Sequence, residues 1–323
     1  MYVLGLQGSP RNKGNTSFFL SAFLKEAENL GADTDVIEVD KKKILPCKEY
    51  TTCETKGFCP IKDDMDEIYP LLRKADGVVV ATPIFFYSAP AQLKAFIDRC
   101  QLFWARKYRL NLTDPKRKFR RGFLLALGAT RGKKLFDGMQ LTAQYFFDAV
   151  GASFSGSLTY NGIEHPGDME KHPAVLEDIK KAIPLFLAPF LKRKKVLFAC
   201  RENACRSQMA GAFAQYHGGA HIDASSAGTE PADEINPLMV EVMAEKGIDM
   251  KFRKPQPVTG AGGAQSPEIY VTMGCGEKCP FTPGVQRLDW DLPDPAGRPI
   301  ETMRAVRDEI EKKVQDLIRQ INQ

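Results

Sequence analysis

The chain has 323 residues, of which 43% are hydrophobic and 26% charged, with a formal net charge of +5. This composition is ordinary for a soluble globular protein, and the length allows two domains, each with its own core. No apolar run is long enough to cross a bilayer, and the first residues lack the cationic segment of a signal peptide, so we expect a cytoplasmic protein. Its eight cysteines are then expected to be reduced, catalytic or metal-bound rather than a disulfide framework.

The first half of the chain alternates predicted strands and helices. Residues 2–6, 77–81 and 122–127 are short apolar runs typical of buried parallel strands. Apolar residues recur with helical spacing over 17–30 and 92–103. This alternation predicts a doubly wound α/β domain, a parallel sheet with helices on both faces and ligands beyond the carboxyl ends of its strands.

The loop after the first predicted strand is rich in hydrogen-bond donors. Gly8 opens it, and Gly14 precedes the first predicted helix. Side-chain donors and backbone N–H groups at such a turn suit a phosphomonoester, although the spacing is not that of a triphosphate-binding loop. An ordinary capped turn is the alternative. The candidate cofactor ligands are Ser9, Arg11, Asn15, Thr16 and Ser17.

Aromatic residues follow the strand predicted at 77–81. At the carboxyl end of a strand they would hold a flat heteroaromatic ring, whereas a run of core aromatics is the alternative. The candidates are Pro83, Ile84, Phe85, Phe86 and Tyr87. The loop after the strand at 122–127 would complete the pocket through Gly128 and Thr130.

Lys and Arg crowd between residues 106 and 121. We interpret this run as a solvated loop, with an electrostatic guide for an anionic dinucleotide as the alternative. It has neither interleaved aromatic residues nor a known module beside it, so we predict no nucleic acid partner.

The first half resembles the NADPH-dependent FMN reductase family and, within it, the iron–sulfur flavoproteins. The resemblance rests on the Gly8-to-Thr16 loop, on Pro83-Ile84-Phe85-Phe86, and on the run from Leu93 to Arg99. It implies a flavodoxin-like fold, bound FMN and reduction by NAD(P)H. It also implies a homodimer or homotetramer assembled through the flavin domain.

One departure concerns a group of cysteines. Iron–sulfur flavoproteins carry four closely spaced cysteines, whereas this chain has Cys47, Cys53 and Cys59, with Tyr50 where the second cysteine is expected. A [4Fe–4S] cluster normally needs four protein thiolates. We therefore predict that no cluster is bound, and we keep the three cysteines as weak candidates for a metal site or an electron relay.

A second domain is predicted from residue 193 to 323, after a first domain at 1–192, because a proline-containing segment and a basic cluster precede a new strand. Its strands are expected near 196–199, 221–225 and 268–273, and its last helix at 301–321. It is expected to be a smaller, doubly wound parallel-sheet domain.

The loop from Cys200 to Ser207 lies between a predicted strand and a predicted helix. Backbone N–H groups and the helix dipole favour an oxyanion there, Arg206 would grip it, and the same field would favour the thiolate of Cys200. Asn203, Ala204, Cys205 and Ser207 would line the cradle. A buried strand-end cysteine beside a surface arginine is the alternative.

Two further features accompany this loop. Asp294 stands before a proline, where it would act as a general acid or serve only as a turn residue. Cys275 and Cys279 are close enough in sequence to form a short disulfide, or to remain two idle thiols. Hydrolysis needs no such pair, whereas reduction takes its electrons from thiols.

This half resembles the low-molecular-weight tyrosine phosphatase family, most closely its arsenate reductase branch. The resemblance rests on Cys200-x5-Arg206-Ser207-Gln208-Met209-Ala210, on the Ser226–Thr229 run, on Met273-Gly274-Cys275, and on Asp294-Pro295. One departure is Gly211, which stands where a glutamate is common in the family. The resemblance implies that Cys200 attacks arsenate held by Arg206, that Asp294 protonates the leaving oxygen, and that Cys275 and then Cys279 carry the oxidation outward. Cys205 is the alternative resolving thiol.

The two halves together suggest a bifunctional oxidoreductase in which NAD(P)H reduces FMN and reduced FMN restores the cysteines. Thioredoxin as the reductant is the alternative route. Two other functions stay open: a phosphatase of tyrosine or small-molecule esters fused to a flavoprotein, and a non-catalytic redox or arsenic sensor.

Overall fold

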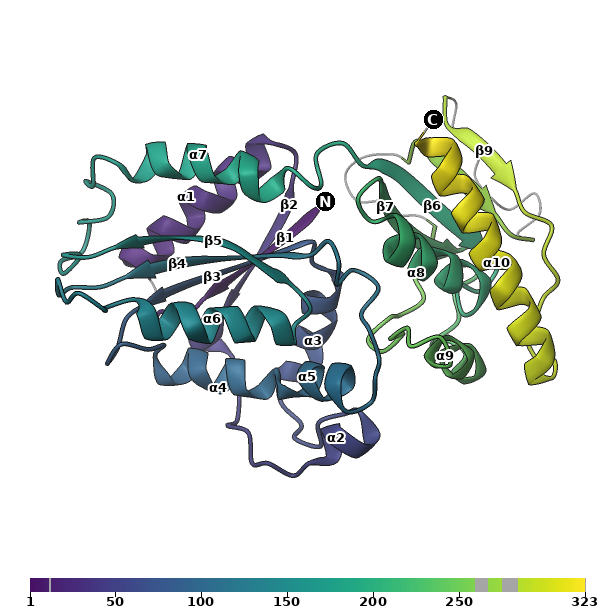
Figure 1. The fold of residues 1–323 in the computed structure, drawn as a ribbon, viewed down its shortest axis with the longest axis horizontal. Coiled ribbons are helices and arrows are strands. Elements are labelled where there is room, and N and C mark those ends of the chain that lie inside the picture. The colour runs from purple at the N-terminus through teal and green to yellow at the C-terminus, as the bar shows by residue number, and fades with distance from the viewer. Residues whose placement is uncertain (12, 259–266, 275–283, 323) are drawn as a thin grey trace. The chain divides into compact units, whose positions relative to one another are not determined.

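The computed structural model describes residues 1–11, 13–258, 267–274 and 284–322 (Figure 1). They form two compact units, Met1–Asn111 with Arg117–Leu191, and Leu112–Lys116 with Lys192–Gln323. The segment Leu112–Lys116 groups with the second unit because Thr113 exchanges backbone hydrogen bonds with Gly247 (2.7 Å) and Asp249 (2.8 Å). The sequence analysis places this segment in the first domain.

The first unit contains a five-stranded parallel sheet in the order β2-β1-β3-β4-β5. The three apolar runs expected as strands are its three central strands, which are buried almost throughout. The two edge strands are more polar and were not predicted. The strands are β1 Tyr2–Gln7, β2 Asp33–Glu38, β3 Gly77–Pro83, β4 Arg121–Leu127 and β5 Ser153–Tyr160.

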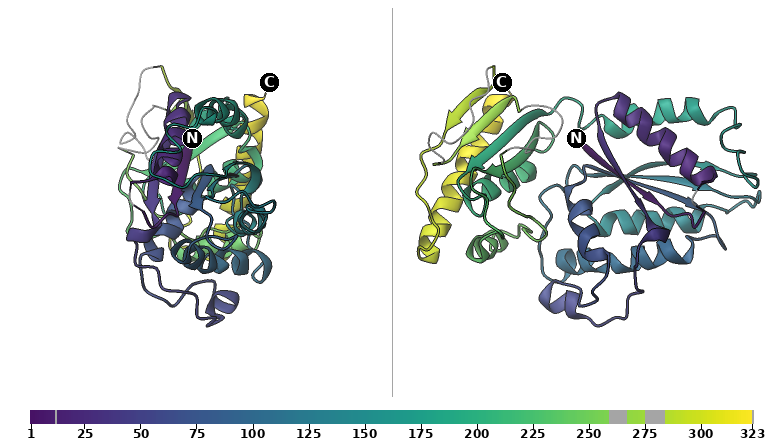
Figure 2. Two further views of the ribbon diagram at one scale, coloured as in Figure 1. Left: turned by 90° about the vertical axis from the view of Figure 1, so that its left-hand side faces the viewer. Right: turned by 180° about the vertical axis from the view of Figure 1, so that it is seen from behind.

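Helices cover both faces of this sheet. In Figure 1, and in the reverse view of Figure 2, α1 and α7 lie on one face and α6 lies on the other. Phe186 of α7 comes close to Gly77 of β3, and Phe147 of α6 to Gly122 of β4. The helical elements are α1 Asn15–Asn29, η1 Val39–Lys41, α2 Thr52–Lys56, α3 Met65–Lys74, α4 Ala91–Arg99, α5 Gln101–Tyr108, α6 Asp137–Ala149 and α7 Val175–Leu187.

The single helix predicted at 92–103 is in fact two helices, α4 and α5, that meet at Cys100. The hydroxyl of Tyr69 donates to the Arg99 carbonyl oxygen at 3.0 Å. The amide of Phe103 donates instead to Cys100, three residues back, at 2.9 Å. A tertiary contact thus occupies a carbonyl at the junction, and the chain tightens and turns there.

A buried ion pair fixes the loop that carries the three cysteines. Arg99 and Asp63 have fully buried side chains 2.5 Å apart, and Arg99 also donates to the Leu45 carbonyl at 2.9 Å. Burial alone would raise the pKa of Asp63, but the hydrogen bonds from Arg99 and from the backbone N–H groups of Leu45 and Met65, with the charge of Arg99, together hold that pKa below its usual value. Both ends of the cysteine loop are therefore tied to the first unit.

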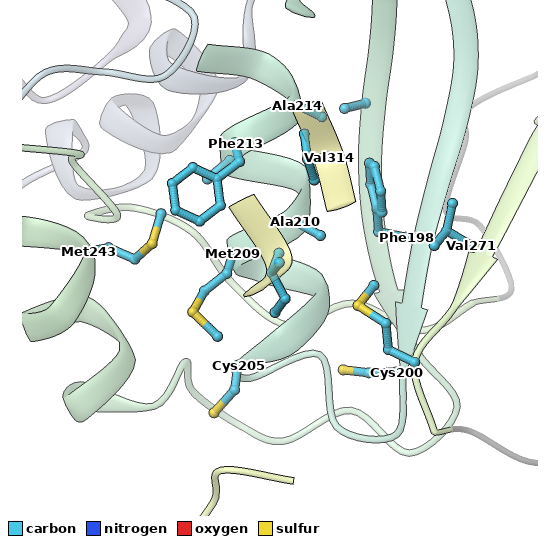
Figure 3. Packing of buried hydrophobic residues seen from close by; sticks show 14 of the residues in the cluster. Phe198, Cys200, Cys205, Met209, Ala210, Phe213, Ala214, Met243, Val271 and Val314 are labelled. Atoms are coloured by element: carbon cyan, nitrogen blue, oxygen red, sulfur yellow. The ribbon is translucent and has the colours of Figure 1, made fainter. Parts of the chain in front are cut away.

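The second unit has a four-stranded parallel sheet in the order β7-β6-β8-β9. Phe198 and Val271 on its strands pack with Met209, Phe213 and Val314 of two helices (Figure 3). Val196, Phe198 and Cys200 alternate along β6, and Met209 and Phe213 are one helical turn apart on α8, as the periods of a strand and a helix require. The elements are β6 Lys194–Cys200, α8 Arg206–Gly218, β7 Ile222–Gly228, α9 Pro237–Ala244, β8 Ile269–Thr272, β9 Gln286–Asp289 and α10 Ile300–Ile321.

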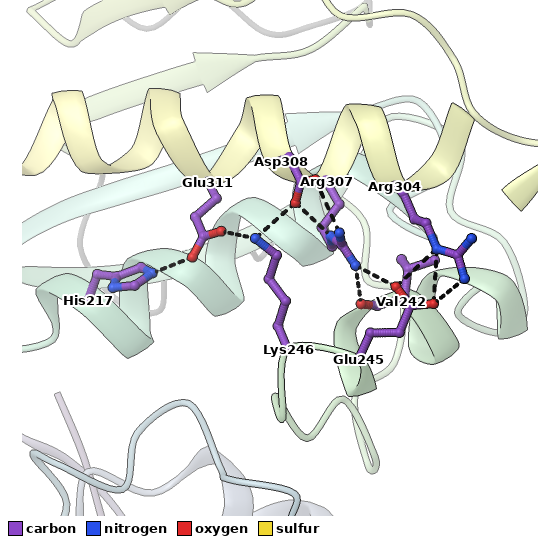
Figure 4. Close-up of polar contacts among 8 residues, drawn as sticks. All are labelled: His217, Val242, Glu245, Lys246, Arg304, Arg307, Asp308 and Glu311. Carbon is purple, nitrogen blue, oxygen red and sulfur yellow. Dashed lines mark hydrogen bonds and ion pairs between the residues drawn. The ribbon is translucent and has the colours of Figure 1, made fainter. Parts of the chain in front are cut away.

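A chain of ion pairs ties α8, the end of α9 and α10 together (Figure 4). Glu311 of α10 bonds His217 at 2.8 Å and Lys246 at 2.5 Å, and Lys246 also reaches Asp308 at 2.8 Å. The hydrogen bonds from Arg307 to Asp308 hold the pKa of this carboxyl at about 2. Asp308 therefore keeps its negative charge through the physiological range of pH.

In the described ranges, none of the helices combines the length and the apolar composition that a membrane crossing needs.

Candidate active site

The loop between β6 and α8 is held in an unusual backbone conformation. Asn203 is fully buried and has a φ of 51°, in the left-handed region. A Cβ atom on Gly228 would lie 2.7 Å from the Arg201 carbonyl oxygen and 2.9 Å from the Asn203 nitrogen. The end of β7 can therefore approach this loop only because residue 228 has no side chain.

The carbonyl oxygens and the amides of this loop have different partners. Four carbonyls accept hydrogen bonds at 2.8–3.2 Å from backbone amides of the segment 229–236: those of Cys200, Arg201, Glu202 and Ala204. For the backbone N–H groups of residues 202–207, no acceptor is found among the described residues. Free amides at the start of a helix bind anions, so this backbone has the geometry that the predicted oxyanion cradle needs.

The predicted nucleophile, cation and acid meet at this cradle. The Cys200 sulfur is 3.0 Å from the Ser207 hydroxyl oxygen. Arg206 donates to the Asp294 carboxylate at 2.7 Å and to the Leu292 carbonyl at 3.3 Å. The Arg206 side chain is buried, whereas Asp294 is 55% exposed. Asp294 is thus open to solvent and lies beside Arg206, the residue predicted to bind the oxyanion.

The other cysteine of the loop, Cys205, lies in a different setting. Figure 3 shows Cys200 at the end of β6 and Cys205 at the start of α8. Cys205 is 6% exposed, and burial, followed by the neighbouring Cys200, raises the pKa of its thiol to about 12. A thiol that stays protonated is a poor nucleophile, which favours a packing role for Cys205.

Cys275 and Cys279 lie outside the described residues. The strand that precedes them runs beside β6, because Met273 donates its amide to the Ala199 carbonyl at 2.8 Å. Gly274 has a φ of 71°, and a Cβ atom there would lie 2.9 Å from a terminal nitrogen of Arg206. The last described residue before Cys275 is therefore adjacent to the oxyanion-binding arginine.

Two glutamines that the sequence analysis did not single out also contact this loop. The side-chain oxygen of Asn203 accepts from the Gln208 amide at 3.1 Å and from the backbone N–H of Gln256 at 3.0 Å. Gln208 lies inside the recognised motif, so its position could have marked it. Nothing in the sequence around Gln256 indicates this contact.

In the first unit, three loops begin at the same edge of the sheet. They follow β1, β3 and β4. All strands are parallel, but in the order 2-1-3-4-5 successive strands are added first on one side of β1 and then on the other, so the strand order reverses between β1 and β3. Ligands of doubly wound sheets bind at this reversal, and flavodoxin with its FMN is a named example of the rule. The topology therefore selects the edge at which the sequence places its cofactor ligands.

The aromatic loop after β3 is strained and exposed. Phe85 and Ser88 exchange backbone hydrogen bonds at 2.9 and 3.0 Å, which leaves Phe86 and Tyr87 as a two-residue turn with φ of 49° and 63°. Aromatic residues disfavour this left-handed conformation, and Phe86 is 102% exposed. The exposed faces of these rings contribute little to folding. A binding role therefore explains them better than the alternative that they are core aromatics.

The loop after β4 lies against this aromatic turn. A Cβ atom on Gly132 would be 2.9 Å from the Tyr87 hydroxyl, and one on Gly138 would be 2.5 Å from the Tyr87 carbonyl oxygen. Gly128 is tied to the end of β5 by a hydrogen bond to the Tyr160 carbonyl at 2.9 Å. Thr130 is exposed. Two of the three predicted loops are thereby brought together.

The loop after β1 uses its polar residues in different ways. Ser9 is buried, and its hydroxyl accepts the Arg11 amide at 3.2 Å. Asn15 donates to the His165 carbonyl at 2.8 Å and accepts from the Met169 amide at 3.1 Å. Both ends of the Asn15 side chain are thus occupied in holding the segment 165–169. Ser9, Arg11, Thr16 and Ser17 are left for a phosphate.

Comparison with known proteins finds a different family in each half of the chain. The NADPH-dependent FMN reductase profile matches residues 1–156, and the low molecular weight phosphotyrosine protein phosphatase profile matches residues 195–323. An iron-sulfur flavoprotein of Methanosarcina thermophila is 33% identical over 174 residues, which cover 54% of this chain and 84% of that protein. A glutaredoxin arsenate reductase of Synechocystis is 34% identical over 131 residues, which cover 40% of this chain and 99% of that protein.

The chain belongs to both families. It is an oxidoreductase in which an FMN reductase-like part is fused to an arsenate reductase-like part, as the sequence predicts. Among solved structures, a thioredoxin-dependent arsenate reductase of Corynebacterium glutamicum is 29% identical, with a TM-score of 0.36, and the match covers 47% of this chain and 78% of that one.

The iron–sulfur flavoprotein relationship draws attention to Cys47, Cys53 and Cys59. Their thiols are free, with Cys47 exposed and the other two half-buried. Burial raises the pKa of Cys53, and the nearby Cys47 and Cys59 add to this shift. Tyr50 is 56% exposed where a fourth thiolate would be needed. The described residues contain no group of three or more His, Cys, Asp or Glu side chains arranged to hold a metal ion.

Proposed function

We propose that this protein reduces arsenate to arsenite with electrons that enter from NAD(P)H. The Cys200 loop is the observation that carries the proposal. It combines a thiol 3.0 Å from Ser207, backbone amides 202–207 with no acceptor among the described residues, and Arg206 paired with Asp294. Such a site suits displacement by sulfur at a tetrahedral oxyanion.

The first step uses residues that this loop brings together. The Cys200 sulfur forms a bond to arsenic, an arsenic–oxygen bond breaks, and Asp294 gives its proton to the departing oxygen. Arg206 and the loop amides neutralise the charge on the remaining oxygens. The product is a covalent thiol adduct in which arsenic is still pentavalent.

The reduction itself requires a second thiol. Cys275 would attack the Cys200 sulfur, so that the sulfur–arsenic bonding pair passes to arsenic and arsenite leaves. Cys279 would then attack Cys275, which frees Cys200 and leaves a Cys275–Cys279 disulfide. These two roles come from the family resemblance. The attack of Cys275 passes two electrons to arsenic and leaves a Cys200–Cys275 disulfide, and the attack of Cys279 only exchanges this disulfide for Cys275–Cys279.

The first unit would hold FMN through its three loops. Ser9, Arg11, Thr16 and Ser17 would bind the phosphate, and the aromatic turn at Phe86 and Tyr87 would contact the flat ring. Bound FMN would supply the chemistry of taking hydride from NAD(P)H and passing electrons on to thiols. A shared chain raises the effective concentration of one part at the other.

We further propose that no [4Fe–4S] cluster is bound. Cys47, Cys53 and Cys59 provide three thiolates where the cluster needs four, and Tyr50 has no ligand of that kind to offer. Purified protein is therefore expected to contain flavin but no acid-labile sulfide. Stoichiometric iron and sulfide in protein prepared without oxygen would contradict this proposal.

The remaining partners are proposals as well. Electrons could enter from thioredoxin or glutaredoxin, the reductants in the names of two relatives. A homodimer or homotetramer through the flavin part, and a reducing cytoplasm that keeps the thiols free, agree with the proposed chemistry.

The proposal is tested by steady-state turnover of the full chain. Purified protein loaded with FMN is mixed anaerobically with NADPH and arsenate, and arsenite is quantified with and without thioredoxin and its reductase. We expect arsenite without added thiol. Arsenite only with thioredoxin would support the reductase but refute the internal electron supply. Hydrolysis of an aryl phosphate, unaffected by Cys275→Ser and without arsenite formation, would favour the phosphatase alternative.

A further inference from the structure

We propose that Gln208, together with the backbone N–H of Gln256, is a positioning residue that fixes the direction of hydrogen bonding onto the Cys200 sulfur. The inference rests on the proposed function only in that it concerns the same nucleophile. Four buried side chains form an unbroken series of contacts: Gln208, Asn203, Ser207 and Cys200.

The direction of the hydrogen bonds along this series is set at one end by a group that can only donate. The backbone N–H of Gln256 lies 3.0 Å from one side-chain atom of Asn203, so this atom is the carbonyl oxygen of the amide and not its nitrogen. The Gln208 nitrogen approaches the same oxygen at 3.1 Å. The orientation of the Asn203 side chain is therefore set by its partners.

Once Asn203 is oriented, the next two hydrogen bonds follow. Its amide nitrogen faces the Ser207 hydroxyl oxygen at 2.7 Å and must donate to it. Ser207 has one hydrogen of its own, and its next partner is the Cys200 sulfur at 3.0 Å. The hydroxyl hydrogen is therefore available to the sulfur, and a thiolate, which can only accept, receives it; this hydrogen bond stabilises the thiolate over the thiol.

Gln208 is itself held in one orientation. Its nitrogen also donates to the Lys254 carbonyl at 3.2 Å, and its oxygen faces a terminal nitrogen of Arg253 at 3.5 Å. A carbonyl accepts only and a guanidinium donates only, so the two contacts agree on which end of the amide is which.

Gln256 is fixed in the same way. Its side chain donates to the Ser226 carbonyl at 2.7 Å, and its own carbonyl accepts the Gly228 amide at 2.9 Å. The segment that orients Asn203 is thereby tied to the end of β7. Since Asn203, Ser207 and Gln208 are 0–2% exposed, water does not compete for these bonds.

The consequence is a specific role for a residue that does not touch the substrate. In Gln208→Glu, an acceptor faces the Asn203 oxygen and opposes the Gln256 N–H, so the Asn203 amide is no longer held in one orientation and in part of the molecules it presents its oxygen to Ser207. The Ser207 hydrogen would then go to Asn203, and Cys200 would lose its donor. In Gln208→Met, one of the two anchors is lost and the Gln256 anchor remains, so the effect is smaller.

The test is the rate at which iodoacetamide modifies Cys200 in full-length protein at pH 7, without arsenate or NADPH. Trypsin cuts after Arg201 and Arg206, so the peptides 196–201 and 202–206 report Cys200 and Cys205 separately by mass spectrometry. Gln208→Glu is expected to slow the reaction by about tenfold, the size of one hydrogen bond to a charged group, and Gln208→Met by about threefold.

A double-mutant cycle with Ser207→Ala decides the mechanism. If Gln208 acts through Ser207, its substitutions should have little effect once Ser207 is alanine. In that background we expect Gln208→Glu to slow the reaction by at most about threefold, through its negative charge alone, and Gln208→Met to have no effect. Equal factors in the two backgrounds would overturn the proposal, since Gln208 would then act through charge or general stability. Should Gln208→Glu not fold, Gln208→Met carries the same criterion alone.

Gln215→Glu is the matched control. Gln215 lies on the same helix, donates to the Ala224 carbonyl at 3.0 Å and accepts from Arg253, the arginine that also contacts Gln208. It touches neither Asn203 nor Ser207, so a charge introduced there tests the effect through Arg253 alone. Gln215→Glu makes the same chemical change as Gln208→Glu. It is expected to leave the rate of Cys200 modification within about twofold of that of the unsubstituted protein, because none of the contacts from Gln208 to Cys200 is lost. Because the assay needs no arsenate, a failure of the proposed arsenate reduction leaves its outcome unaffected.

Discussion

The two candidate sites of this protein differ in how complete they are before anything binds. Around Cys200 the polar side chains are buried and bonded to each other, and the loop carbonyls are tied to the segment 229–236. At the carboxyl edge of the first sheet, the aromatic turn is strained and Phe86 is fully exposed. Covalent chemistry by a side chain needs its groups fixed in advance, whereas a cofactor site is completed by the cofactor itself.

The sharpest way to separate the two sites is Cys200→Ser. A hydroxyl is far less nucleophilic than a thiolate, so we expect arsenate reduction to fall by at least about a thousandfold. FMN binding, and NADPH oxidation by the flavin part measured without arsenate, should not change. Arsenite formation and flavin content measured on the same preparation give both readings, and retained arsenite formation would contradict the assignment.

Arg206→Lys probes the oxyanion cradle. Lysine keeps the positive charge but cannot contact both Asp294 and the oxyanion through a planar fork, so we expect kcat/KM for arsenate to fall by about a hundredfold. Arg201→Lys is the control, because Arg201 is an exposed arginine of the same loop that pairs with Glu230. Equal effects of the two substitutions would point to net charge instead of geometry.

Phe86→Gly tests whether strain in the aromatic turn serves the flavin. Glycine accepts a φ of 49° without cost, so the apo protein should become more stable by about 1 kcal/mol. FMN affinity should fall about tenfold, because one aromatic contact is lost. Thermal unfolding and a flavin fluorescence titration measure the two effects. Leu185→Ala, at a side chain 79% exposed on α7, should change FMN affinity little.

The smallest expected effect concerns the ion-pair network of the second unit. Asp308 has its pKa lowered to about 2, so its stabilising contribution is present above pH 4 and is lost as the pH falls from about 4 to about 2. Asp308→Asn should cost about 1 kcal/mol at neutral pH, since Asp308 is half-exposed and solvent screens its ion pairs. Denaturant unfolding should show this difference at pH 7 and almost none at pH 2, and a constant difference would contradict the assignment.

The sequence predicts the strongly apolar parts of the fold and misses the polar ones. The central strands of both sheets are short apolar runs, and they were found. The edge strand β2, Asp33–Glu38, has only one fully buried residue, so its pattern resembles a loop. The break between α4 and α5 depends on a hydroxyl from Tyr69, thirty residues away in sequence, which local periodicity does not contain.

At the candidate sites, the residues that would carry out the reaction were easier to predict than the residues that hold them in place. Cys200, Arg206 and Asp294 are marked by residue type and spacing, and the structure brings them together. The role of Asn15 in holding His165 and Met169 depends on contacts about 150 residues apart, and the contact of Gln256 with Asn203 depends on the backbone alone. Such contacts exist only after folding.

The central claim is that reducing power stored in the flavin restores the thiols that reduce arsenate, and a single turnover tests it most directly. FMN in the full-length protein is reduced anaerobically with one equivalent of NADPH, arsenate is added without any other thiol, and flavin absorbance and arsenite are followed together. We expect about two arsenite per protein, one from the thiols already reduced and a second matched by reoxidation of the flavin, and none in Cys200→Ser. Flavin that stays reduced while arsenate remains unchanged after the first thiol-driven equivalent would contradict the account.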